Sequence, residues 1–225
     1  MTLNEFLILI TQVTLVLIAV LTFANYIRRR EQTRLDIALL FGALAYIVFI
    51  QRLLLNPGPN AELNRWLGLT TQLALIAHPY LLLRLVLDFR PVPAGVWWFA
   101  IIGLGVSWVL LVFFPSLPLP VTVTFVAYFV FVELYAAVAF VRGAMMTAGV
   151  THWRLTLAAS GSGLLALLVL GIGVTLVFPW SAPLVDTINQ FVGLFAVLAY
   201  YAVFAPPFWL RRYWQLSEMQ RFLRQ

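Results

Sequence analysis

The sequence contains no cysteine and no lysine. Without cysteine the chain has no disulfide, no thiolate nucleophile and no iron–sulfur or zinc-thiolate site. Without lysine it cannot form a Schiff base, which excludes a retinal-binding rhodopsin. Charged residues make up only 10% of the chain, whereas 63% of its residues are hydrophobic. A soluble domain of this composition would have a largely apolar surface, so the sequence predicts a polytopic membrane protein.

Seven apolar runs are each long enough to cross about 30 Å of hydrocarbon at about 1.5 Å per residue. They are Phe6–Ile27, Leu35–Leu55, Asn64–Leu87, Ala94–Phe114, Val121–Val141, Leu155–Phe178 and Leu184–Phe204. The connections between them are short, and several are rich in proline, which ends helices. Short loops make consecutive helices antiparallel, so we expect an all-α, seven-transmembrane helix bundle over residues 1–206.

The arginines gather on one side of this predicted bundle. That side holds Arg28, Arg29, Arg30, Arg34, Arg84, Arg90, Arg142, Arg154, Arg211, Arg212, Arg221 and Arg224. The other side holds only Arg52 and Arg65. Basic residues near membrane helices are enriched in the cytoplasm, so we expect the N-terminus outside and the C-terminus in the cytoplasm. The net charge of +6 is then a topology signal, and no nucleic acid is expected as a partner.

Two ionisable residues fall near the middle of predicted membrane helices, where burial is costly. Helical rise places His78 roughly 21 Å and Glu133 roughly 18 Å from the outer ends of their runs. The two can therefore meet as a buried polar pair joined by a charge-assisted hydrogen bond, with Pro79 kinking the helix that holds the histidine. Alternatively, His78 hydrogen-bonds to a neighbouring helix, and Glu133 stays protonated or reaches Arg84.

A second polar group gathers in the outer part of the first, second, third and seventh runs. A polar cavity open to the outside would explain it, because amides offer donors and acceptors to a small ligand and Asp186 can neutralise Arg52 or Arg65. The ligand-binding residues of this hypothesis are Gln51, Arg52, Gln72, Asp186, Asn189 and Gln190. Alternatively, these side chains satisfy one another between helices or face water at the helix ends.

Small residues in the fourth and sixth runs are typical of surfaces on which helices pack closely. They include Gly103, Gly105, the stretch Ala159-Ser160-Gly161-Ser162-Gly163, Gly171 and Gly173. Nothing in the sequence matches a zinc site, a phosphate loop or a pair of catalytic carboxylates. We therefore expect no metal, no cofactor and no catalytic residue in this chain.

The seventh run leads into an aromatic and proline-rich stretch that ends in two arginines. From Tyr200 it reads Tyr-Tyr-Ala-Val-Phe-Ala-Pro-Pro-Phe-Trp-Leu-Arg-Arg. Helical spacing of apolar residues resumes over Trp209–Gln225, so residues 207–225 are predicted to begin a cytoplasmic signalling helix. This exit and the seven short-looped helices resemble the seven-transmembrane N-terminal sensor region of bacterial histidine kinases and related signalling proteins. The resemblance covers nearly the whole chain in topology, but in motif only Tyr200–Trp214.

The resemblance implies a sensory input module in the bacterial inner membrane. Such a module binds a small ligand or senses the membrane, and it passes a conformational signal through its last helix to a cytoplasmic output domain. The implied partners are the lipid bilayer, that output domain and a second copy of the chain. The chain is then either the input domain of a longer protein, such as a histidine kinase, or a stand-alone protein of the same build, since no phosphoacceptor box or ATP-binding segment occurs in these 225 residues.

Two other classes of protein stay open at this stage. In a small membrane transporter or channel, the polar residues would line a continuous path, and the cytoplasmic half offers few steps for one: Glu133, His78 and Arg84. A membrane enzyme is the third class, and no set of residues in the sequence specifies one.

Overall fold

The computed structural model describes residues 3–55, 60–114, 118–204, 206, 207, 210 and 212, without the side chains of residues 3–5, 52, 53 and 55. Within this part of the chain every long element is a helix, which confirms the predicted all-α fold class. The helices are α1 (Leu3–Arg29), α2 (Gln32–Leu55), α3 (Ala61–Leu87), α4 (Ala94–Phe113), α5 (Leu119–Met145), α6 (Val150–Val177) and α7 (Ala182–Phe204). Each contains a segment long and apolar enough to span a membrane.

Several helices extend past the predicted apolar runs, at both ends of the bundle. α5 continues to Met145 and α6 begins at Val150, so the predicted connection of residues 142–154 shrinks to residues 146–149. Hydropathy marks only the part of a helix that lies in hydrocarbon, and the polar turns beyond it stay helical. Gly149, whose φ is 67°, reverses the chain within this short connection.

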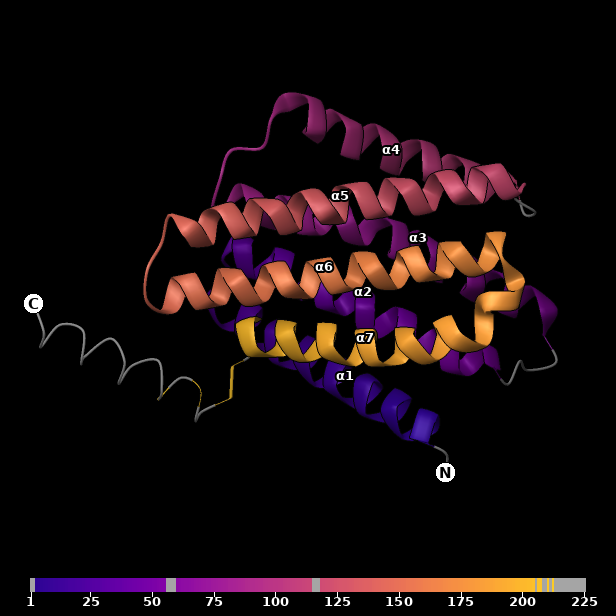
Figure 1. The fold of residues 1–225 in the computed structure, drawn as a ribbon, viewed down its shortest axis with the longest axis horizontal. Coiled ribbons are helices and arrows are strands. Elements are labelled where there is room, and N and C mark those ends of the chain that lie inside the picture. The colour runs from indigo at the N-terminus through magenta and orange to yellow at the C-terminus, as the bar shows by residue number, and fades with distance from the viewer. Residues whose placement is uncertain are drawn as a thin grey trace, which may run out of the picture.

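Six of the helices form a closed ring in the order α1, α2, α3, α5, α6 and α7, with α7 packed back on α1. α4 lies outside this ring against α3 and α5, at the edge of the bundle in Figure 1. Two side chains fasten it there. The Tyr128 hydroxyl donates to the Ala100 carbonyl over 3.0 Å, and the Trp108 indole donates to the Leu73 carbonyl over 3.1 Å.

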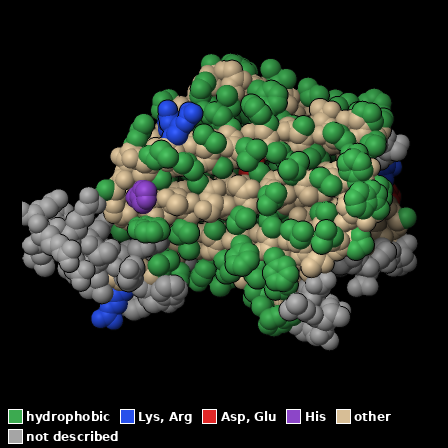
Figure 2. All heavy atoms as spheres, in the orientation of Figure 1, with side chains coloured by type: hydrophobic (Ala, Val, Ile, Leu, Met, Phe, Trp, Pro, Cys, Tyr) green, Lys and Arg blue, Asp and Glu red, His purple; other side chains and the backbone are tan. Residues whose placement is uncertain are grey.

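The outer surface of the bundle is apolar over most of its length. Figure 2 shows hydrophobic side chains spread across one face, with the few charged ones near the two ends. A surface of this kind suits lipid rather than water, in agreement with the predicted membrane protein. We call the end where α1, α3, α5 and α7 finish the arginine-rich end, since Arg28, Arg84 and Arg142 lie there.

Four of the six glycines predicted as packing surfaces do meet a neighbouring helix closely. A Cβ atom would lie 2.5 Å from Tyr128 at Gly103 and 2.9 Å from Tyr200 at Gly161. Similar contacts confirm the prediction for Gly171 and Gly173. The prediction is wrong for Gly105 and Gly163, because a Cβ at either position would meet nothing within 4 Å.

Candidate functional site

His78 of α3 and Glu133 of α5 lie side by side in the interior of the ring. Both side chains are fully buried, and His78 Nδ1 lies 3.7 Å from Glu133 Oε2. That distance is short enough for an ion pair when His78 carries the proton but is too long for a hydrogen bond. Two of the alternatives considered from the sequence differ from what is observed. Neither ring nitrogen of His78 has a hydrogen-bond partner in the described part of the chain, and Arg84 pairs with Asp36 instead of Glu133.

Two hydroxyl groups extend this pair to α6 and α7. The Tyr200 hydroxyl donates to Glu133 Oε1 over 3.4 Å and shares a 3.0 Å hydrogen bond with the Ser162 hydroxyl. Tyr200 is only 1% exposed, and its ring fits against α6 because Gly161 has no side chain. His78, Glu133, Ser162 and Tyr200 therefore form one polar cluster, the central network, to which α3, α5, α6 and α7 each contribute one residue.

Aromatic rings enclose the central network on two sides. Phe41 of α2 packs edge-on against Tyr200 with ring centroids 5.7 Å apart. Phe129 of α5 stacks on His78 with centroids 6.0 Å apart and planes inclined by 16°. Surroundings of this kind have a low dielectric constant, which strengthens every polar contact inside and raises the cost of losing one.

The central network leaves hydrogen-bonding capacity unused. Both ring nitrogens of His78 and the Oε2 atom of Glu133 lack hydrogen-bond partners among the described residues, at a cost of about 1–3 kcal/mol for each such buried group. One proton can lie on Glu133, which leaves both residues neutral, or on His78, which makes them an ion pair. A move of the proton between the two residues changes the charge on the Glu133 carboxyl group, to which the Tyr200 hydroxyl donates. Ionisable side chains inside a membrane bundle are functional candidates for this reason.

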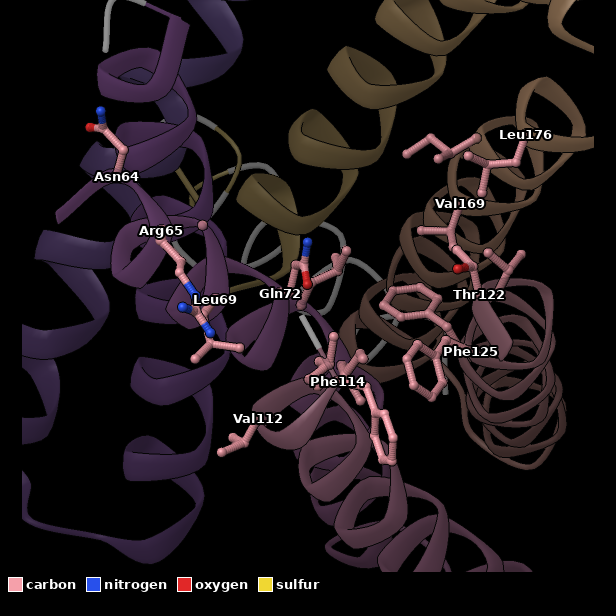
Figure 3. A pocket seen from close by; sticks show the side chains of 17 residues that line it. Asn64, Arg65, Leu69, Gln72, Val112, Phe114, Thr122, Phe125, Val169 and Leu176 are labelled. Atoms are coloured by element: carbon pink, nitrogen blue, oxygen red, sulfur yellow. The ribbon is translucent and has the colours of Figure 1, made fainter. Parts of the chain in front are cut away.

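A cavity of about 630 Å³ lies at the end of the bundle opposite the arginine-rich end. Its walls come from α3, α4, α5 and α6, and we call it the α3–α6 cavity. In Figure 3 side chains of α3, including Arg65 and Gln72, face those of α5 and α6 across the opening. Polar side chains lie on α3 and at the start of α5, whereas Ile76, Phe129 and Val169 form an apolar floor.

Among the members of the predicted ligand-binding group whose side chains the structure describes, Gln72 alone lines this cavity. Gln51 and Asp186 are exposed, and Asn189 and Gln190 are half-buried on α7 away from the cavity walls. Asn189 faces α6, since its amide would lie 2.6 Å from a Cβ atom at Gly171. The side chain of Arg52 lies outside the described part of the chain. A ligand site around Asp186 therefore stays a prediction.

Three residues of the interior were not singled out from the sequence. Asp36 of α2 is 4% exposed and accepts from Arg84 of α3 over 2.9 Å, near the arginine-rich end. Asp36 could have been singled out from the sequence, because it is an acidic residue within an apolar run. Ser162 was predicted only as part of a packing surface and Tyr200 only as part of the exit stretch. A hydroxyl in an apolar helix gives no sign of its partner until the helices are arranged.

Neither a metal site among the described residues nor similarity to known proteins indicates a function. The described residues contain no group of three histidine, aspartate or glutamate side chains that could hold a metal ion. Comparisons of the chain with protein-family models, with curated proteins and with solved structures found no match. The central network and the α3–α6 cavity are therefore the features from which a function can be inferred.

Proposed function

We propose that this protein is a membrane-embedded sensory input module of the bacterial inner membrane. A ligand or the membrane itself changes the packing of the bundle, and α7 passes that change to a cytoplasmic output domain. The arginine-rich end is the cytoplasmic end in this proposal, because positive charge near membrane helices is retained there. α7 ends on that side at Phe204, so its movements are transmitted toward the cytoplasm.

The contact of Tyr200 with the rest of the central network carries the proposal. Tyr200 lies one turn before the end of α7, and its hydroxyl contacts Glu133 of α5 and Ser162 of α6. The last turn of α7 therefore cannot rotate or slide without changing buried polar contacts on neighbouring helices. A two-state packing of such contacts is a known means of converting small shifts into helix movement.

A small transporter or channel is the second candidate, and the buried pair of His78 and Glu133 supports it. Intramembrane ionisable residues mark ion or proton paths in many membrane proteins. A path would also need polar groups between the central network and each end of the bundle. On the side of the α3–α6 cavity, however, the ring of Phe129 covers His78 and itself lines the cavity. This apolar layer favours the sensor over the transporter.

A fusion protein tests the sensor proposal. Residues 1–225 are joined to the cytoplasmic part of a bacterial histidine kinase, and autophosphorylation is measured in membrane vesicles. We expect Tyr200→Phe to change the output, because the substitution removes both hydroxyl contacts and keeps the ring. Tyr201→Phe is the matched control, since Tyr201 is the adjacent, half-buried residue of the same helix.

Two results would contradict the sensor proposal. Equal output from wild type, Tyr200→Phe and Tyr201→Phe would show that the network does not control α7. Proton flux through proteoliposomes of the unfused chain that is lost in Glu133→Gln would favour the transporter instead.

A further inference from the structure

The α3–α6 cavity has the size and shape of a ligand site. Its volume of about 630 Å³ lies within the range of about 300–1,000 Å³ typical of small-molecule pockets. Along α3 its lining extends from Asn64 to Ile76, which is roughly 18 Å at the rise of an α-helix. An occupant that touches both ends is therefore elongated.

Polarity is divided along this length. Asn64 and Arg65, in the first two turns of α3, line the mouth, and Gln72 lies two turns deeper. The Thr122 hydroxyl donates a hydrogen bond to the Pro118 carbonyl of its own helix end. The floor of the cavity beyond it is apolar. A polar solute would lose its hydrogen bonds to water against such a floor, so the deep part of an occupant is hydrocarbon.

Arg65 supplies the charge at the mouth. It forms no ion pair with any residue that the structure describes, and its side chain is exposed. A guanidinium binds a carboxylate through two parallel hydrogen bonds, and such charge-assisted bonds are stronger than neutral ones. The complementary head group is therefore an anion.

The walls of the cavity also indicate how an occupant enters. Val112, Phe114 and Leu176 line it and are 47%, 55% and 40% exposed on the side of the bundle. In a membrane protein, exposed apolar side chains of this kind face lipid. A molecule dissolved in the bilayer can thus slide in between helices without crossing water.

We propose that the α3–α6 cavity binds a single-chain anionic amphiphile of the long-chain carboxylate type, taken up from the membrane. Its carboxylate lies against Arg65 (Figure 3), and its chain runs along α3 to Phe129 and Ile76, which also line the cavity. Phe129 stacks on His78, so the occupant touches the wall of the central network. Binding depends on the cavity alone, whereas an effect of binding on α7 rests on the proposed sensor function.

Photocrosslinking tests the binding. The probe is a palmitate analogue with a diazirine near its methyl end, added to the full chain in phosphatidylcholine nanodiscs, and crosslinks are mapped by mass spectrometry. We expect crosslinks on α3, α5 and α6 near Phe129. Gly68→Phe should abolish them, because Gly68 lines the cavity and a Cβ atom there meets nothing within 4 Å, so the added ring projects into free space.

Gly105→Phe is the matched control. A Cβ at Gly105 also meets nothing within 4 Å, but this residue of α4 does not line the cavity, so its crosslinks should equal those of wild type. Equal crosslinking of Gly68→Phe and Gly105→Phe would overturn the proposal. Unlabelled palmitate and the two-chain lipid phosphatidylglycerol are then compared as competitors of the probe. If phosphatidylglycerol displaces the probe at the same molar ratio as palmitate, the single-chain assignment is overturned.

A second variant tests the head group without filling the cavity. Arg65→Gln should weaken palmitate binding about tenfold through loss of the charge-assisted hydrogen bonds, and should leave binding of the neutral palmityl alcohol unchanged. Equal loss for the acid and the alcohol, or no loss for either, would contradict a carboxylate at Arg65. If palmitate binds as expected but leaves the output of the kinase fusion unchanged, the binding site stands and the sensor proposal fails.

Discussion

Substitution of Gly161 by alanine probes how tightly α7 is held against α6. The added Cβ would lie 2.9 Å from both the Cδ1 and Cε1 atoms of Tyr200, closer than carbon atoms pack. The ring has little room to retreat, because Tyr200 is 1% exposed and packs edge-on against Phe41. We therefore expect the tyrosine to move and its hydroxyl to lose the contacts with Ser162 and Glu133.

The size of the effect follows from two opposing contributions. Overpacking of a well-packed interior costs about 1–3 kcal/mol. Replacement of a glycine inside a helix by alanine contributes about 1 kcal/mol of stabilisation. Gly163→Ala isolates the second contribution, since Gly163 is in the same helix and a Cβ there meets nothing within 4 Å. Gly161→Ala should thus be less stable than Gly163→Ala by about 1–3 kcal/mol, the overpacking cost alone.

Equilibrium unfolding of both variants in mixed micelles, by titration with dodecyl sulfate, measures this difference. Tryptophan fluorescence follows the transition, and the free energies of unfolding are compared at equal micelle composition. A Gly161→Ala protein that is as stable as Gly163→Ala would refute the close approach of Tyr200 to α6. The placement of the central network would then be wrong as well.

Three further predictions concern other parts of the bundle. Glu133→Gln and His78→Gln should be non-additive in the free energy of unfolding by about 0.5 kcal/mol or more if the two residues interact, and additive effects in the same titration would argue against that interaction. Arg84→Gln should destabilise the protein by about 2 kcal/mol, because the buried Asp36 carboxylate loses its ion pair. The double variant with Asp36→Asn should recover part of this loss in thermal unfolding, and a double variant that recovers none would contradict the pairing. Because the chain has no cysteine, single introduced cysteines report topology cleanly in intact cells. Labelling from outside is expected at Asn60 and Ser181 but not at Gln32 and Thr147, and the reverse pattern would reject the proposed orientation.

The sequence was sufficient to predict the seven helices because hydropathy alone distinguishes membrane-spanning segments. It also placed His78 and Glu133 at a similar depth, since helical rise converts position in the chain into depth. The neighbours of each helix could not be predicted. α4 follows α3 in the chain, but it lies outside the ring and leaves α3 to pack on α5.

This order of helices also explains where the described residues of the predicted ligand-binding group lie. The site predicted around Asp186 requires α7 to lie beside α2 and α3. Instead α7 packs mainly between α6 and α1, so Asn189 meets α6, and Gln72 joins a cavity formed by other helices. Conversely, Ser162 and Tyr200 face each other only because α6 and α7 are adjacent in the ring. The depth of a residue in the membrane can be predicted from the sequence, whereas the neighbouring helix that its side chain faces depends on how the helices pack.

The distance between the exit of α7 and the end of α5 is the most direct test of the central claim. Spin labels on cysteines at positions 142 and 212 report it by pulsed electron paramagnetic resonance in nanodiscs, and both residues are exposed. Loss of a buried hydrogen bond, worth about 1 kcal/mol, changes the ratio of two conformations about fivefold. We predict that Tyr200→Phe redistributes the measured distances to this extent and that Tyr201→Phe leaves them as in wild type. Identical distributions in all three proteins would contradict the claim that the central network controls the position of the last helix.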